Sequence, residues 1–182
     1  MVDAVVDACC VLNLAAAGGG DLDAMLAQLG YRFHIPRIVL IEPRVLWKIV
    51  DDERIDLLVD IETSIDAGRI IPCELDSPEE LELFVRVAVE LKDPDAACLT
   101  LALNRGWPLA TDDGKILRVA RDYGAATITT PALLKQWAES GKVGTEVVAQ
   151  AARNVEDLAN YRPKAGSVLH AWWSDLVATT DS

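Results

Sequence analysis

Two adjacent carboxylates, Asp112 and Asp113, follow Thr111, which ends the short apolar run of Leu109 and Ala110. Gly114 then lets the chain turn into an amphipathic, helix-like segment from 115 to 123. The pattern predicts a strand that delivers acids to its own C-terminal tip. In parallel α/β sheets, ligands bind outside the carboxyl ends of the strands. The chemistry expected of acids gathered there is the binding of a hard divalent cation, since Mg²⁺ and Mn²⁺ prefer oxygen ligands.

Three further acids stand where the ends of strands or helices could meet that pair. Asp7 ends the apolar run near the N-terminus, and Glu42 lies beside a proline. Asp95 follows Asp93 and Pro94, which fit the N-cap and first position of a helix, so the helix itself does not require the second acid. Each acid alone has a structural explanation as a cap or a solvated charge. Several carboxylates brought together repel one another, and a divalent cation removes that conflict.

Neither histidine nor cysteine is placed to join these acids, which argues against zinc. Cys9 and Cys10 are adjacent, and Cys73 and Cys98 stand alone, so the spacing fits neither a metal site nor a disulfide framework. The two histidines, His34 and His170, are far apart in the sequence. We therefore expect small apolar thiols in a reducing compartment.

Strands and helices alternate along most of the chain. Apolar runs predict strands at 4–7, 31–35, 69–73, 107–111 and 125–129. Helical spacing and capping residues predict helices at 8–17, 22–29, 36–50, 54–65, 78–91, 93–106, 115–123, 131–141, 145–161 and 167–179. This alternation is typical of an α/β fold with a mostly parallel sheet and right-handed crossovers. The last two helices have no strand between them and form a C-terminal extension.

Composition sets the broad class. A chain of 182 residues with 51% hydrophobic and 25% charged residues is expected to fold as one globular domain. The net charge of −12 argues against a simple nucleic-acid binder, because phosphate contacts normally come from Lys and Arg. The N-terminus carries acids in its only apolar run and resembles no signal peptide, and no apolar stretch is long enough for a membrane helix. We expect a cytoplasmic protein without a membrane partner.

A family resemblance rests on short motifs taken in order. The motifs are Val5–Leu14, Glu42, Asp93–Ala102, Leu109–Asp113, and Ala125–Thr130 with Leu133 and Leu134. In this order and spacing, over about residues 3–140, the chain resembles the PIN-domain nucleases, whose largest group is the VapC-type toxins of bacterial toxin–antitoxin modules. The resemblance implies a three-layer α/β/α sandwich with a central, mostly parallel sheet. It implies a nuclease domain over 1–140, with a helical extension over 141–182 packed on the same domain.

The resemblance also implies the site. The residues that match the family's catalytic positions are Asp7, Glu42, Asp95 and Asp113. The resemblance implies that these acids, with Asp112, hold one or two Mg²⁺ or Mn²⁺ ions. Asn13 and Thr111 match polar positions that support such a site. The chain departs from the pattern after Asp7, where Ala8, Cys9 and Cys10 replace the usual Ser or Thr. A supporting hydroxyl is therefore expected to be missing.

The implied activity is hydrolysis of RNA to 5′-phosphate and 3′-hydroxyl ends. Candidate RNA contacts near the expected site are Arg37, Lys115 and Arg118. The implied protein partners are a cognate antitoxin and a second copy of the chain in a homodimer. The alternative is a catalytically weak or inactive PIN-fold protein that acts by binding a protein partner. A phosphoacceptor receiver domain fits poorly, because the run 125–131 lacks the lysine such domains need.

Overall fold

The computed structural model describes residues 1–42, 44–51 and 53–179. Contacts group the chain into two compact units that alternate along the sequence. Unit 1 comprises 1–11, 30–43 and 61–129, and unit 2 comprises 12–29, 44–60 and 130–182. The predicted division at residues 140 and 141 stays a prediction.

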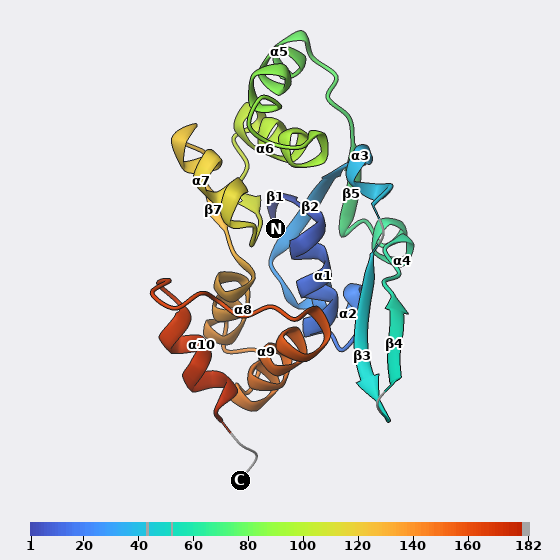
Figure 1. The fold of residues 1–182 in the computed structure, drawn as a ribbon, viewed down its shortest axis with the longest axis vertical. Coiled ribbons are helices and arrows are strands. Elements are labelled where there is room, and N and C mark those ends of the chain that lie inside the picture. The colour runs from blue at the N-terminus through green and yellow to red at the C-terminus, as the bar shows by residue number, and fades with distance from the viewer. Residues whose placement is uncertain (43, 52, 180–182) are drawn as a thin grey trace. The chain divides into compact units, whose positions relative to one another are not determined.

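Unit 1 contains a five-stranded sheet with the order β5-β2-β1-β6-β7 (Figure 1). Its strands are β1 Val2–Val6, β2 Tyr31–Pro36, β5 Ile70–Cys73, β6 Leu109–Ala110 and β7 Thr127–Ile128. Every pairing between these neighbours is parallel. The predicted class is confirmed: this is an α/β protein with a parallel sheet flanked by helices, plus C-terminal helices. The strands after 107 and 125 are shorter than predicted.

Five helices belong wholly to unit 1, and α1, Ala8–Ala17, begins in it. They are α3 Arg37–Leu40, α4 Glu62–Asp66, α5 Pro78–Val87, α6 Asp93–Arg105 and α7 Gly114–Asp122. Helix α6 contacts β1, β2 and β6, and α5 packs on α6 (Figure 1). Helix α4 contacts β5. Helix α6 is therefore the element that covers the middle of the sheet.

The sequence of α6 explains its position and its ends. Every residue from Ala96 to Ala102 is buried, as expected for a helix that is apolar nearly all round. Gly106 ends the helix with a φ of 65°, which glycine adopts without steric cost. The predicted N-cap is wrong by one residue: Lys92 occupies the cap position, and Asp93 is the first residue of the helix. Both Asp93 and Asp95 lie in the first turn, where negative charge is favourable.

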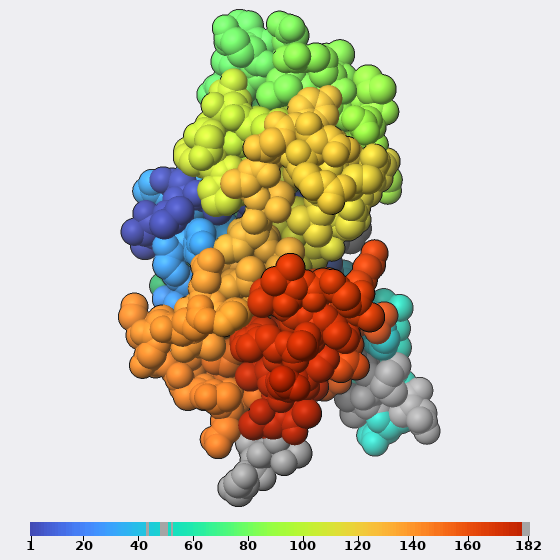
Figure 2. All heavy atoms as spheres, turned by 90° about the vertical axis from the view of Figure 1, so that its left-hand side faces the viewer, coloured from blue at the N-terminus to red at the C-terminus, as the bar shows by residue number. Residues whose placement is uncertain are grey.

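Unit 2 is mostly helical. Its elements beyond the rest of α1 are α2 Leu22–Gln28, β3 Val45–Val50, β4 Glu53–Leu58, α8 Thr130–Glu139, α9 Thr145–Ala159 and α10 His170–Val177. Helix α9 packs against α8, α10 and β3. In the space-filling view, α8 to α10 form one continuous surface, coloured orange to red (Figure 2). The fully buried Trp173 holds α10 in place by donating a 2.8 Å hydrogen bond from Nε1 to Glu156.

Two predicted helices, at 36–50 and 54–65, are wrong. The chain instead forms the short α3, an antiparallel hairpin of β3 and β4, and the short α4. The segment 45–50, Val-Leu-Trp-Lys-Ile-Val, is rich in β-branched and aromatic residues, and this preference outweighs the helical spacing. Asp51 follows β3 with a φ of 51°, a conformation suited to a tight turn. Pro43, on which a kinked helix was predicted, lies outside the described residues.

Within the described ranges, no single helix is long and apolar enough to cross a bilayer. Helices α1 and α2 are long and apolar enough for a membrane span only when taken together, and the chain bends by 88° between them.

Candidate functional site

The tips of β1 and β6 bring Asp7 and Thr111 side by side. The two strands pair in parallel, with Val6 opposite Ala110, so the next residue of each emerges at the same edge of the sheet. The Asp7 backbone N–H donates to the Ala110 carbonyl at 3.2 Å, which continues the pairing. The Thr111 hydroxyl donates a hydrogen bond to Oδ2 of Asp7. The prediction that these two strand tips meet is therefore confirmed.

Asp7 is buried and surrounded by donors. Its Oδ1 accepts the backbone N–H of Cys10 at 2.8 Å. The Cys9 thiol lies 3.2 Å from Oδ1 and 3.1 Å from Oδ2, and donates to the carboxylate. The sequence predicts a missing hydroxyl after Asp7, but a thiol occupies that role and Thr111 supplies the hydroxyl from the neighbouring strand.

The burial of Asp7 changes its ionisation. Burial is the largest influence and raises the pKa of Asp7 to about 7. The hydrogen bonds from Thr111, Cys10 and Cys9 lower the pKa and offset part of that effect, while the charge of Asp112 raises it further. A carboxyl with a raised pKa inside a cluster of acids is a candidate functional group.

Asp113 has a structural role that explains its position. It is the N-cap of α7, and its Oδ1 accepts the backbone N–H groups of Lys115 at 2.7 Å and Ile116 at 3.0 Å. Its own backbone N–H donates to the Thr111 hydroxyl oxygen at 3.2 Å. Thr111 thus connects Asp7 on one side with the cap of α7 on the other.

Asp95 shares its surroundings with two other predicted acids. It is half-buried in the first turn of α6, and this burial is the largest cause of its raised pKa. The charges of Asp113 and Glu42 raise the pKa of Asp95 further, while those of Lys92 and Lys115 lower it. Asp113 and Glu42 therefore both lie within electrostatic range of Asp95. The three acids come from α6, the start of α7 and the segment after α3.

The carboxylates gather in one region without forming an assembled metal-ligand set. Among the described residues, no group of three or more His, Cys, Asp and Glu side chains is close enough to hold a metal ion. Both oxygens of Asp7 accept hydrogen bonds, and one oxygen of Asp113 caps α7. The donor chemistry suits a hard dication, because every candidate is a carboxylate.

The three predicted RNA contacts differ in their surroundings. Arg37 lies 3.2 Å from Glu74 in an exposed ion pair, and Arg118 lies 3.9 Å from both Glu90 and Asp122. Burial raises the pKa of Asp95, and the charges of Lys92 and Lys115 offset part of that rise, so both lysines lie near this acid. Of the three predicted RNA contacts, Lys115 is the one whose charge acts on Asp95.

Asn13, which was predicted to support the site, is buried on the part of α1 that belongs to unit 2, whereas the acids belong to unit 1. Cys9 is a residue of the region that sequence reasoning missed. The signal was present, since Cys9 stands two residues after Asp7, where the motif usually carries a hydroxyl. A thiol is a weak donor of similar reach to a hydroxyl.

The chain was compared with models of protein families and with curated proteins. No family model matches the chain, and no curated protein matches it either.

Proposed function

We propose that this protein is a divalent-cation-dependent phosphodiesterase acting on RNA, similar to the PIN-domain nucleases. The observation that supports the proposal most is the environment of Asp95: burial raises its pKa most, and the charges of Asp113 and Glu42 raise it further. Asp7 stands at the neighbouring strand tip, and its pKa is raised as well. Carboxylates brought together from separate elements repel one another when charged, and a bound cation removes that repulsion.

The side chains would divide the work as follows. The Mg²⁺ or Mn²⁺ ion would be held by carboxylates, namely those of Asp7, Glu42, Asp95 and Asp113, with Asp112 beside them. Such an ion supplies Lewis acidity toward a phosphodiester and the water that attacks it. Thr111 and Cys9 orient the Asp7 carboxylate through their hydrogen bonds. Lys115 would supply a positive charge for a phosphate of the substrate.

The hydrolysis would follow from this arrangement. Water adds at phosphorus and the bond to the 3′-oxygen breaks, which leaves 5′-phosphate and 3′-hydroxyl ends. A cation favours the charged form of each carboxylate, so binding would release the proton that Asp7 holds near neutral pH. Cation affinity should therefore increase with pH around 7.

The decisive experiment is cleavage of a labelled single-stranded RNA by the full chain with Mg²⁺, Mn²⁺ or EDTA. We expect cleavage with either cation, and none with EDTA or with the double variant Asp95→Asn plus Asp113→Asn. Asp157→Asn is the matched control, since Asp157 is an exposed acid on α9. Circular dichroism of each variant checks folding. If wild type and the double variant behave identically, the proposal fails.

A second function is favoured by a specific observation. The described residues contain no assembled metal-ligand set, and both Asp7 oxygens are already hydrogen bonded. A PIN-like fold without strong cation binding would act by binding a protein, such as a cognate antitoxin or a second copy of the chain. Light scattering after size exclusion tests for the second copy. A small DNA-binding protein encoded in the adjacent reading frame would favour the toxin–antitoxin assignment.

A further inference from the structure

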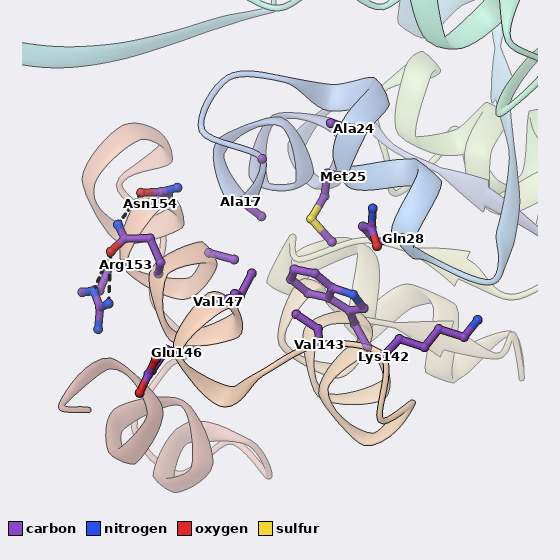
Figure 3. Close-up of a pocket in the computed structure, with 14 residues that line it drawn as sticks. Ala17, Ala24, Met25, Gln28, Lys142, Val143, Glu146, Val147, Arg153 and Asn154 are labelled. Carbon is purple, nitrogen blue, oxygen red and sulfur yellow. Dashed lines mark hydrogen bonds between the residues drawn. The ribbon is translucent and has the colours of Figure 1, made fainter. Parts of the chain in front are cut away.

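A cavity of about 630 Å³ lies within unit 2, between α1 and α2 on one side and the segment from Trp137 to Asn154 on the other. Figure 3 shows Met25 and Gln28 of α2 facing Val143 and Lys142, which precede α9. The volume falls in the range of sites that take small organic molecules. The cavity is separate from the acids, all of which belong to unit 1.

The apolar lining combines buried and exposed side chains. Met25 and Trp137 are 3% and 7% exposed, so the inner wall consists of core residues. Val147, on the first turns of α9, is 54% exposed. Burial of exposed apolar surface is favourable, so binding of an apolar molecule that covers Val147 and the adjacent apolar wall would be stabilised.

A polar atom in the lining lacks a partner within the described part of the chain. The indole Nε1 of Trp137 is buried, and no described residue forms a hydrogen bond with it. An indole N–H can only donate, and buried donors are nearly always paired. Trp137 lines the cavity, so an acceptor oxygen on a bound molecule would supply the partner that its indole N–H lacks among the described residues.

The charged side chains of the lining favour an anionic acceptor. Lys142 is exposed, and across the described part of the chain its ammonium group forms no ion pair. Arg153 is already engaged, because it donates to Gln150 and to the Thr179 carbonyl. Figure 3 shows Glu146, the acid of the lining, extending away from Met25 and Gln28.

We propose that this cavity binds a small molecule with an apolar body and one carboxylate group. The body would contact Met25, Val143 and Val147, and the carboxylate would accept the Trp137 N–H and attract the Lys142 ammonium. This site requires no metal and stands independently of the proposed nuclease activity.

The test is an NMR titration of the ¹⁵N-labelled full chain with 4-phenylbutyrate as the probe. The chain has five tryptophans, and the indole signal lost in Trp137→Phe identifies Trp137. We expect 4-phenylbutyrate to shift that signal saturably and the other indole signals little. Acetate, which lacks the apolar body, should leave it unmoved. The alcohol 4-phenylbutan-1-ol lacks the carboxylate and should bind at least about 10-fold more weakly.

Two matched valine variants test the location. Val147→Glu replaces an exposed apolar side chain of the lining with an anion and should abolish the shift. Val168→Glu makes the same change at a residue that is 97% exposed and outside the lining, so binding should be retained. The proposal is overturned if 4-phenylbutyrate leaves the Trp137 signal unmoved, if acetate shifts it equally, or if Val147→Glu binds like wild type.

Discussion

Thr111 donates its hydroxyl to Oδ2 of Asp7, and this bond joins the tips of two strands that lie 104 positions apart in the chain. The same hydroxyl oxygen accepts the backbone N–H of Asp113. One threonine therefore supports both a buried carboxylate and the first residue outside α7. This dual role makes Thr111 the residue on which the geometry of the acidic region depends.

Thr111→Val should destabilise the protein by about 1–3 kcal/mol, because it leaves a buried carboxylate with one donor fewer. Thr100→Val is the matched control. The Thr100 hydroxyl is also buried but forms no hydrogen bond with any residue that the structure describes, so its loss should be neutral or stabilising. Urea denaturation measures both changes. Equal losses of stability in the two variants would contradict the role given to Thr111.

The raised pKa of Asp7 predicts a pH dependence of stability. The unfolded carboxyl loses its proton near pH 4, while the folded one retains it up to about pH 7. Over this window the folded state binds more protons, so the free energy of unfolding falls as pH rises, by a total on the order of 4 kcal/mol. Asp7→Asn should remove that fall. Urea denaturation from pH 4 to 8 in EDTA measures it, and parallel curves for wild type and variant would disprove it.

If the proposed function is right, substitution of Lys115 should weaken RNA binding more than substitution of Arg118. Lys115→Met should weaken binding and lower the salt dependence, by about 0.7 in the slope of log K against log salt for one single-strand contact. Arg118→Met should change little, because Arg118 already lies beside Glu90 and Asp122. Fluorescence anisotropy with labelled RNA in EDTA measures binding without cleavage. Equal effects would remove the preference for Lys115.

Away from the acidic region, Arg105 stabilises a buried charge. Its Nε donates to Glu80 at 2.9 Å, and the Glu80 side chain is only 2% exposed. Arg105→Met should cost about 3 kcal/mol, because it leaves that carboxylate without its cation. Arg54→Met breaks an exposed pair with Asp56 and should cost less than about 1 kcal/mol. Thermal denaturation compares them, and similar losses would show that Glu80 is compensated elsewhere.

Much of the fold was predictable, because the parallel strands are short apolar runs bounded by Gly, Pro or acids. The segment from 36 to 65 was not, since its apolar residues fit a helical period and a strand about equally well. Contact between β3 and α9 adds stabilisation that no local pattern contains. Residue type predicts this segment better than the spacing of its apolar residues does, because Val45, Trp47 and Ile49 favour a strand.

The acidic region was predictable in its convergence but not in its detail. Parallel strands must deliver Asp7 and Thr111 to one edge, so topology alone predicts that they meet. The hydrogen bonds of Cys9 depend on how the first turn of α1 places a side chain, which spacing cannot give. The electrostatic link from Glu42 to Asp95 likewise depends on the packing of α3 on α6.

The strand order has a consequence for synthesis of the chain. Strand β1 is translated first but lies between β2 and β6, so one of its edges can be paired once residue 36 has emerged. The other edge stays open until residue 110 has left the ribosome. During that interval the nascent protein presents an apolar strand edge, which is the kind of surface that chaperones shield.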